Sequence, residues 1–183
     1  MLCKITYRII TLLAMCRYQR KGKKMDAMER RKKRGRLRYN EDEIKLAITV
    51  LEQMEKTLDV MFYLMDKEGA RPFVTILISA EYEDLRMLLD SEKRNTDLLF
   101  EVDKEQNLYT IICQETKIDG AYRFAERFIR ALKIFKAKEI YAVEVEVRTN
   151  NHTAKEVVFK LIDTYVRAVH EERNGEIGFH SLR

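Results

Sequence analysis

The sequence of 183 residues contains very little proline and glycine, with one Pro and six Gly. So small a share excludes a collagen-like repeat and a disordered chain rich in these two residues. Hydrophobic residues make up 46% of the chain and charged residues 36%, which is typical of a helix-rich folded protein. We expect one domain and a tail, because a core of about 150 residues buries roughly 68–70% of its unfolded surface.

Cysteine and histidine are also scarce, and neither is spaced for a known kind of site. Cys3, Cys16 and Cys113 contain no C-x-x-C pair, and their odd number excludes a closed disulfide framework. The three histidines form no H-x-x-x-H or H-E-x-x-H motif. A structural zinc site needs about four N or S ligands, so we expect no metal or other cofactor. Cys113 lies in an apolar run and is expected to pack as a small hydrophobic residue.

The apolar run IITLLAMC (9–16) is too short to cross a membrane, because it has eight residues where about 20 are needed. The basic segment that follows it favours retention on the cytoplasmic side. We expect a cytoplasmic protein, with a membrane-peripheral location as an alternative. A third interpretation is that the working protein starts at Met25 or Met28, without residues 1–24.

Positive charge is concentrated in the first part of the chain. Residues 17–38 hold twelve Lys or Arg against Asp26 and Glu29. Residues 1–38 carry +12 and the whole chain carries +5, so residues 39–183 carry −7. We therefore expect a basic, disordered tail over residues 1–38 before an acidic domain. Residues 17–38 could bind nucleic acid or an anionic membrane surface.

A long amphipathic helix is predicted within residues 39–70. Asn40 can cap its start, and apolar residues then recur at steps of three and four, namely Ile44, Ala47, Leu51, Met54, Leu58, Met61 and Met65. Such a stripe fits a coiled coil that dimerises the chain. Further apolar residues widen it, which favours a helix that covers a sheet.

The domain at 71–183 is predicted to alternate strands and helices. Strands are expected at 72–79, 98–102, 108–113 and 139–148. Helices are expected at 81–89, from Thr116 with a capping box to Asp119, and from Thr153 with a capping box to Glu156, the last ending at Asn174-Gly175. In strand 139–148, Val143, Val145 and Val147 alternate with Glu144, Glu146 and Arg148, which predicts a sheet with one wet face.

This order of elements predicts an α/β protein of the α+β type, with a βαββαβ sheet covered by helices and preceded by a long helix. The first six elements of the domain follow the ferredoxin-like split βαβ arrangement. An RNA-binding RRM shares that arrangement but needs several aromatics on its central strands, where LYTIICQE (108–115) supplies only Tyr109.

Residues 94–132 read RNTD-LLFEV-DKEQN-LYTII-CQETKIDGAYRFAERFIRAL. This stretch resembles the GGDEF family, the diguanylate cyclases that make cyclic di-GMP, and the likeness extends over roughly residues 72–178. In that family an RxxD motif lies five residues before the GGDEF signature. Here Arg94 and Asp97 match RxxD, and DKEQN falls in register with GGDEF. The matches in the helix that follows are Asp119, Gly120, Ala121, Ala125, Glu126 and Arg130.

The resemblance implies a nucleotide cyclase-like fold, but the departures predict that catalysis is lost. The signature positions hold Asp103, Lys104, Glu105, Gln106 and Asn107, so both glycines that let the backbone approach a nucleotide are replaced. Glu105 keeps one acidic metal-ligand position, whereas Ser79 stands near the position of the family's other metal-ligand Asp. Phosphoryl transfer needs a metal held between carboxylates and phosphates. We therefore expect a degenerate GGDEF-like domain that is not an enzyme.

The RxxD motif implies two kinds of function for such a domain. In the family it marks an inhibitory site for cyclic di-GMP, and an Arg fork with an Asp acceptor suits that ligand. The domain would then be a cyclic di-GMP receptor in signalling. Alternatively, Arg94 pairs with Asp97 or Glu92 as ordinary surface charge, and the domain binds a protein partner or a second copy of the chain. An adaptor acting through residues 17–38 and a residual Mg²⁺ enzyme using Glu105 and Glu81 are the remaining alternatives.

Overall fold

The computed structural model describes residues 39–68 and 71–182. The basic tail, the apolar run 9–16 and the two alternative start sites therefore lie outside the described residues. Contacts between Cα atoms group Glu41–Arg183 into one unit. In the part of the chain that the structure describes, no helix combines the length and the hydrophobicity that crossing a membrane requires.

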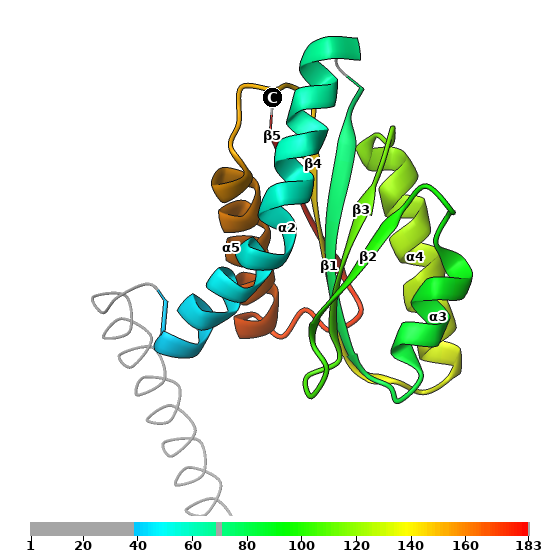
Figure 1. The fold of residues 1–183 in the computed structure, drawn as a ribbon. Helices are drawn as coiled ribbons and strands as arrows, with labels where there is room; N and C mark the ends of the chain where they lie inside the picture. Colours follow the sequence, from blue (N-terminus) through cyan, green and yellow to red (C-terminus); the bar gives the residue numbers. More distant parts are fainter. Residues whose placement is uncertain (1–38, 69–70, 183) are drawn as a thin grey trace, which may run out of the picture. The chain divides into compact units, whose positions relative to one another are not determined.

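Five strands form one sheet in the order β2-β3-β1-β4-β5 (Figure 1). The strands are β1 (Phe73–Glu81), β2 (Leu98–Asp103), β3 (Leu108–Cys113), β4 (Lys138–Val147) and β5 (Ile177–Leu182). β1 pairs antiparallel with both β3 and β4, and β2 pairs antiparallel with β3. β5 runs parallel to β4. The prediction of an α+β sheet is confirmed, with one strand more than expected.

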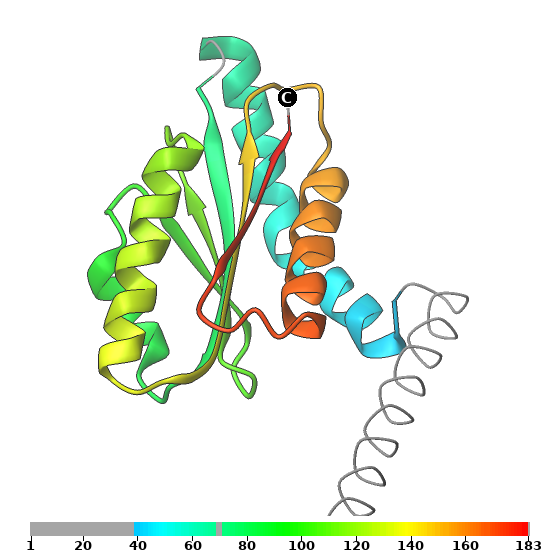
Figure 2. The same ribbon diagram turned by 180° about the vertical axis from the view of Figure 1, so that it is seen from behind.

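Helices cover both faces of the sheet, as Figures 1 and 2 show from opposite sides. On one face lie α2 (Glu41–Glu68) and α5 (Ala154–His170), and on the other lie α3 (Leu85–Glu92) and α4 (Ile118–Ile134). The core under α3 and α4 includes Ile76, Ile111 and Phe128, which are fully buried. The first strand is apolar on both faces because each face packs against helices.

The long helix α2 covers the sheet as predicted, but its buried stripe is shorter than expected. Met54, Leu58, Met61 and Met65 are buried, together with Val50. Ile44, which the pattern assigned to the same stripe, is 48% exposed. Figure 1 shows the first turns of α2 to the side of the sheet and next to the end of α5, where Glu43 pairs with His170, so no strand lies beneath them. Dimerisation through α2 stays a prediction.

Strand β4 departs from its predicted wet face, because Glu144 and Glu146 are both fully buried. They stand opposite Ile76 and Val74 of β1, on the face that α4 covers. Alternation along the strand was therefore correct, but the polar side does not face solvent.

The two predicted capping boxes have different outcomes. At Thr153 the box forms, with Thr153 Oγ1 accepting from Glu156 N at 3.3 Å and Glu156 Oε2 accepting from Thr153 N at 2.8 Å. At Thr116 the prediction was wrong, because α4 begins at Ile118 and Thr116 Oγ1 donates to the Gln114 carbonyl oxygen at 2.8 Å. Glu146 caps the start of α4 instead, because its Oε1 accepts from Ile118 N at 2.9 Å.

Two further boundaries differ from the prediction. β1 continues to Glu81 and α3 starts only at Leu85, because the chain turns where Tyr82 N donates to the Ala80 carbonyl oxygen at 2.9 Å. α5 ends at His170 rather than at Asn174-Gly175, and the chain then adds β5. Gly175 has a φ of +72°, a conformation that glycine adopts without strain. Gly175 therefore lies in the turn that precedes β5, and not at the end of α5 as predicted.

Candidate functional site

The hairpin between β2 and β3, which contains the signature residues 103–107, is held by hydrogen bonds within its own tip. Asp103 Oδ1 accepts from Glu105 N at 2.8 Å and from Gln106 N at 3.0 Å. This is an Asx turn, in which a side-chain oxygen takes the place of a backbone carbonyl. Asn107 closes the loop with a φ of +47°, a conformation in which Asn is enriched among non-glycine residues. The tip therefore holds its shape through its own Asp and Asn.

The base of the hairpin is tied to the loop that follows β1. Asn107 Nδ2 donates to the carbonyl oxygen of Tyr82 at 3.2 Å. The Tyr82 ring in turn stacks on Phe135, just after α4, with centroids 5.4 Å apart and planes 10° apart. The hairpin, the end of β1 and the end of α4 thus form one connected region.

Ser79 lies at the same end of the sheet, because it is the register partner of Leu108, the first residue after the hairpin. Its hydroxyl is 2.8 Å from Tyr165 Oη on α5, and Ser79 is only 7% exposed. Burial raises the pKa of Tyr165, while the hydrogen bond with Ser79 opposes that rise. The side chain at this position therefore points to a phenol of α5.

These residues do not fit the Mg²⁺ site that the resemblance implies. A Mg²⁺ ion takes carboxylates and phosphate oxygens as ligands, and here one of the two expected carboxylate positions is a serine bonded to a tyrosine. Nowhere in residues 39–68 and 71–182 do three or more His, Cys, Asp or Glu side chains gather as possible metal ligands.

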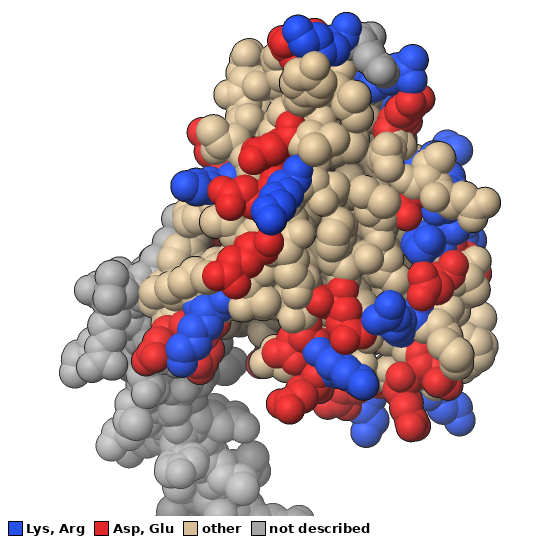
Figure 3. All heavy atoms as spheres, viewed as in Figure 1, with Lys and Arg blue, Asp and Glu red and all other residues tan. Residues whose placement is uncertain are grey.

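Figure 3 shows how charge is distributed around this region. Acidic and basic side chains are mixed at the lower end of the face shown, where Figure 1 places the hairpin and α3. An ion pair joins Arg86 of α3 to Glu101 of β2, with Nη1 and Oε2 2.7 Å apart. The surface near the hairpin therefore carries no single sign of charge.

The RxxD residues lie at the opposite end of β2 from the hairpin. Arg94 and Asp97 precede the strand, and its six residues (Leu98–Asp103) separate them from the tip by about 20 Å at roughly 3.4 Å per residue. The sequence motif is continuous, but the structure divides it between two ends of the sheet. Ser79 joins the hairpin, whereas Arg94 and Asp97 form a second, separate cluster.

Within that second cluster, Arg94 holds Asp97 in a bidentate ion pair. Arg94 Nε donates to Asp97 Oδ2 at 3.2 Å, and Nη2 donates to Oδ1 at 3.0 Å. The backbone N–H of Arg94 also donates to Oδ2, at 3.0 Å. The pairing of these two residues was one of the predicted alternatives, but the pair is not solvated as expected, because Asp97 is only 4% exposed.

Arg94 also connects this loop to the end of β3. Its Nη2 donates to the carbonyl oxygen of Gln114 at 3.2 Å and to Thr116 Oγ1. The bond to Asp97 is the main cause that raises the pKa of Arg94. The other predicted partner, Glu92, instead pairs with Arg127 of α4 at 3.0 Å. The cluster thus fastens the start of β2 to the loop before α4.

Two residues that take part in these contacts, Tyr165 and Glu146, were not predicted as site residues, and Glu146 was expected on a wet strand face. The sequence offers no local signal for either contact, because Ser79 lies 86 residues from Tyr165 and Ile118 lies 28 residues from Glu146.

Comparison with known proteins identifies the fold. No family model matches the chain, and no curated protein matches it in sequence. Among solved structures, it is similar to a microbial GGDEF domain studied for its interaction with bis-(3,5)-cyclic di-GMP, with a TM-score of 0.58, 13% identity, and coverage of 70% of this chain and 92% of that one.

Two further structures agree with this result. The active GGEEF domain of a diguanylate cyclase from Vibrio cholerae aligns with a TM-score of 0.55 and 12% identity over 67% of this chain and 92% of that one. The diguanylate cyclase SiaD of Pseudomonas aeruginosa, in complex with its activator SiaC, aligns with a TM-score of 0.57 and 12% identity over 97% of this chain and 80% of that one.

Proposed function

We propose that this chain, which has the nucleotide cyclase-like fold of GGDEF domains, is a regulatory module that acts by binding and does not turn over GTP. The observation that carries this proposal is the hairpin closed by Asp103. A fold of this kind hosts active and inactive proteins alike, so the argument depends on the residues at the hairpin and not on the fold.

The closed hairpin supports a loss of catalysis for a physical reason. At a nucleotide site, glycines leave room for phosphates near the backbone, and free N–H groups bind them. Here Asp103 places a carboxylate at the first of those positions, and that carboxylate accepts the N–H groups of Glu105 and Gln106. A phosphate approaching this tip would meet a negative charge and two amides already in use.

The cluster at Arg94 supports an internal role in preference to one in cyclic di-GMP recognition. Reading a guanine would require the Asp97 carboxylate to accept from the base, but that carboxylate is buried and takes three bonds from Arg94. The Arg94 side chain as a whole remains 56% exposed, so Arg94 could still contact a phosphate. We therefore propose a protein as the principal partner. One structural neighbour was solved with an activator protein, which is consistent with this choice.

The first test is turnover of GTP by the full chain. We expect no cyclic di-GMP from GTP with Mg²⁺ or Mn²⁺, measured by chromatography of the nucleotides after prolonged incubation. The matched control is Glu105→Gln, which removes the one retained acidic position. Metal-dependent product that disappears in this variant would refute the proposal.

The second test is calorimetric titration of the full chain with cyclic di-GMP, with wild type beside Arg94→Ala and Arg123→Ala. We expect no binding, or binding that Arg94→Ala and Arg123→Ala weaken equally. Micromolar binding lost only in Arg94→Ala would make the domain a cyclic di-GMP receptor and would overturn the choice of a protein partner. Adaptor activity through residues 17–38 stays a separate prediction, because that segment lies outside the described residues.

A further inference from the structure

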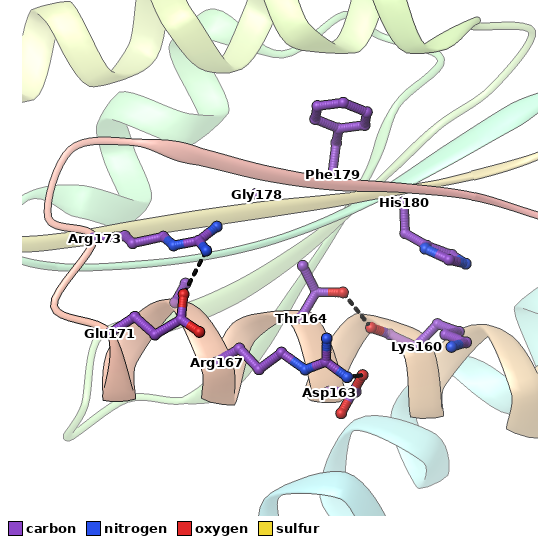
Figure 4. A pocket seen from close by; sticks show the side chains of 10 residues that line it. Lys160, Asp163, Thr164, Arg167, Glu171, Arg173, Gly178, Phe179 and His180 are labelled. Carbon is purple, nitrogen blue, oxygen red and sulfur yellow. Dashed lines mark hydrogen bonds and ion pairs between the residues drawn. The ribbon is translucent and has the colours of Figure 1, made fainter. Parts of the chain in front are cut away.

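A polar cleft lies between α5 and the edge strand β5, and it shares no residue with the hairpin or the Arg94 cluster. Its volume is about 250 Å³. Pockets for drug-sized ligands occupy about 300–1,000 Å³, so this cleft suits a smaller molecule. Its charged lining comes from α5, from the loop that follows it and from β5, as Figure 4 shows. Three segments thus converge on one small space.

The lining is rich in cationic side chains. Lys160 and Arg167 come from α5, Arg173 from the loop, and His180 from β5. Two acids, Asp163 and Glu171, line the cleft as well. With His180 neutral, three cations face two anions. The cleft therefore has a small positive charge within a domain whose overall charge is negative.

The two arginines are held in place by the two acids. Arg167 Nη2 lies 2.8 Å from Asp163 Oδ2, and the Asp163 side chain is only 7% exposed. Arg173 pairs with Glu171. Both guanidinium groups remain about half exposed, and each has five N–H donors in a planar fork. An arginine that gives one edge to a carboxylate can still offer another edge to a second anion.

Lys160 and His180 are different, because neither has an ion-pair partner within residues 39–68 and 71–182. Both side chains are half-buried in the cleft. Partial burial and the neighbouring Lys160 lower the pKa of His180, and Arg167 acts in the same direction. Asp163 acts in the opposite direction. Lys160 is therefore the cation of the cleft whose charge no carboxylate pairs within the described residues, and a bound anion could pair with it.

The depth of the cleft depends on Gly178. A Cβ atom at this position would lie 3.1 Å from Thr164 Cγ2 and 3.1 Å from Val143 Cγ1, so a side chain would require these neighbours on α5 and β4 to move by a few tenths of an ångström. Residues two apart on a strand share a face, which places His180 on the same side as Gly178. Figure 4 shows Phe179 pointing the other way. Glycine thus lets β5 approach α5 closely while His180 turns into the cleft.

We propose that this cleft binds a phosphate group, either as free phosphate or as a small phosphomonoester. A dianionic phosphate matches several converging donors, and guanidinium forks bind phosphate oxygens in a bidentate manner. The proposal goes beyond the proposed binding function, because neither the hairpin nor Arg94 takes part. Failure of either proposal would leave the other standing, since they depend on different residues.

The test is an NMR titration of the full chain with inorganic phosphate and, in parallel, with glycerol 3-phosphate. Chloride at matched ionic strength serves as the reference, and the resonances of Gly178 and the His180 ring are followed. We expect chemical shifts that saturate with added phosphate at both residues. We also expect the pKa of His180 to rise on binding. The charged groups that surround His180 in the cleft are Lys160, Asp163, Arg167, Glu171 and Arg173. A higher affinity for glycerol 3-phosphate than for inorganic phosphate would identify a phosphomonoester as the ligand, and equal affinities would identify phosphate itself.

Lys160→Gln is expected to weaken binding at least tenfold, because it removes one charge-assisted bond. Lys155→Gln on the same helix is the control, and it keeps binding unchanged because Lys155 does not line the cleft. The basic tail is present in every variant, so its own contacts with phosphate cancel. Shifts equal to those in chloride, or affinities that Lys160→Gln and Lys155→Gln change alike, would overturn the proposal. His180→Gln provides a second check that does not touch α5.

Discussion

Two glutamates on the same face of β4 show how differently one sheet can treat a buried carboxyl group. Glu146 lies near the end of the strand, where it accepts from Ile118 N at 2.9 Å, Arg148 Nε at 2.7 Å and Ser181 Oγ at 2.9 Å. Glu144 lies two residues earlier, and neither of its buried oxygens has a hydrogen-bond partner. Both side chains are fully buried, so position relative to the helix ends decides the difference.

The pKa values of the two groups move in opposite directions. Burial raises the pKa of Glu144 from its ordinary value of 4.5 to about 8. Burial also acts on Glu146, but the bonds from Arg148, Ile118 and Ser181 hold its pKa below the usual range. Glu144 is therefore a neutral acid at pH 7, whereas Glu146 is a carboxylate that caps α4. A buried acid needs a helix N-terminus or a cation to stay charged.

The largest expected effect on stability comes from removing the Glu146 carboxylate, so that this part of β4 loses its hydrogen bonds and resembles the surroundings of Glu144. Glu146→Ala removes the acceptor for three groups and leaves the first turn of α4 without its cap. We expect the free energy of unfolding to fall by about 2–4 kcal/mol, from the lost cap and the donors left without an acceptor, measured by urea denaturation at pH 7. Arg148→Ala, which takes away one partner only, should cost clearly less. Equal losses in the two variants would contradict the role of Glu146 as a cap.

The second effect concerns pH. Because the pKa of Glu144 is raised in the folded state, the folded chain binds its proton more tightly, and stability falls as pH rises from 4.5 towards 8. Between pH 6 and pH 8 we expect a loss of about 2 kcal/mol. Glu144→Met replaces the acid with an apolar side chain of similar length and should remove this slope. A slope that is unchanged in Glu144→Met would show that another group causes it.

A smaller effect is expected at Arg94. Arg94→Ala leaves Asp97 buried with only the bond from the Arg94 backbone N–H. Because the Arg94 side chain is 56% exposed, we expect a loss of about 1–2 kcal/mol, measured by thermal unfolding. Arg123→Ala on α4 serves as the control and should change stability little. No loss in Arg94→Ala would mean that the ion pair is not structural and would strengthen the cyclic di-GMP alternative.

The smallest effect is expected at Ser181. Ser181→Ala deletes one of the three bonds to Glu146 and keeps the cap of α4 intact. We expect a loss of about 1 kcal/mol and a small rise in the pKa of Glu146, followed by carboxyl NMR during an acid titration. Ser91→Ala, which removes a hydroxyl bonded to the Leu88 carbonyl oxygen, is a matched control that leaves this pKa unchanged.

Local patterns in the sequence predicted most of the fold. The capping box at Thr153 was correct because its partner, Glu156, lies three residues away. The cap at Thr116 was wrong because the Thr116 side chain is engaged by Arg94, 22 residues earlier. β5 was missed because its six residues include Gly178, which interrupts any strand pattern. A contact with a distant segment thus explains the error at Thr116, and a local interruption of the pattern explains the error at β5.

The candidate site was only partly predictable for the same reason. The register of DKEQN and RxxD indicated which segments to examine, and the hairpin lies where it was expected. The burial of Asp97 and the contact of Ser79 with Tyr165 depend on how α4 and α5 cover the sheet. No sequence motif indicated the cationic cleft, because Lys160, Arg173 and His180 come together only when β5 forms beside β4.

At the hairpin tip, one side chain controls the access of water to two backbone amides. The amides of Glu105 and Gln106 belong to exposed residues, yet both donate to one carboxylate oxygen of Asp103. Their hydrogens can exchange with water only while that side chain is rotated away. The two amides should thus exchange together and more slowly than their exposure suggests. Rotation of the single Asp103 side chain would therefore free both amides at once.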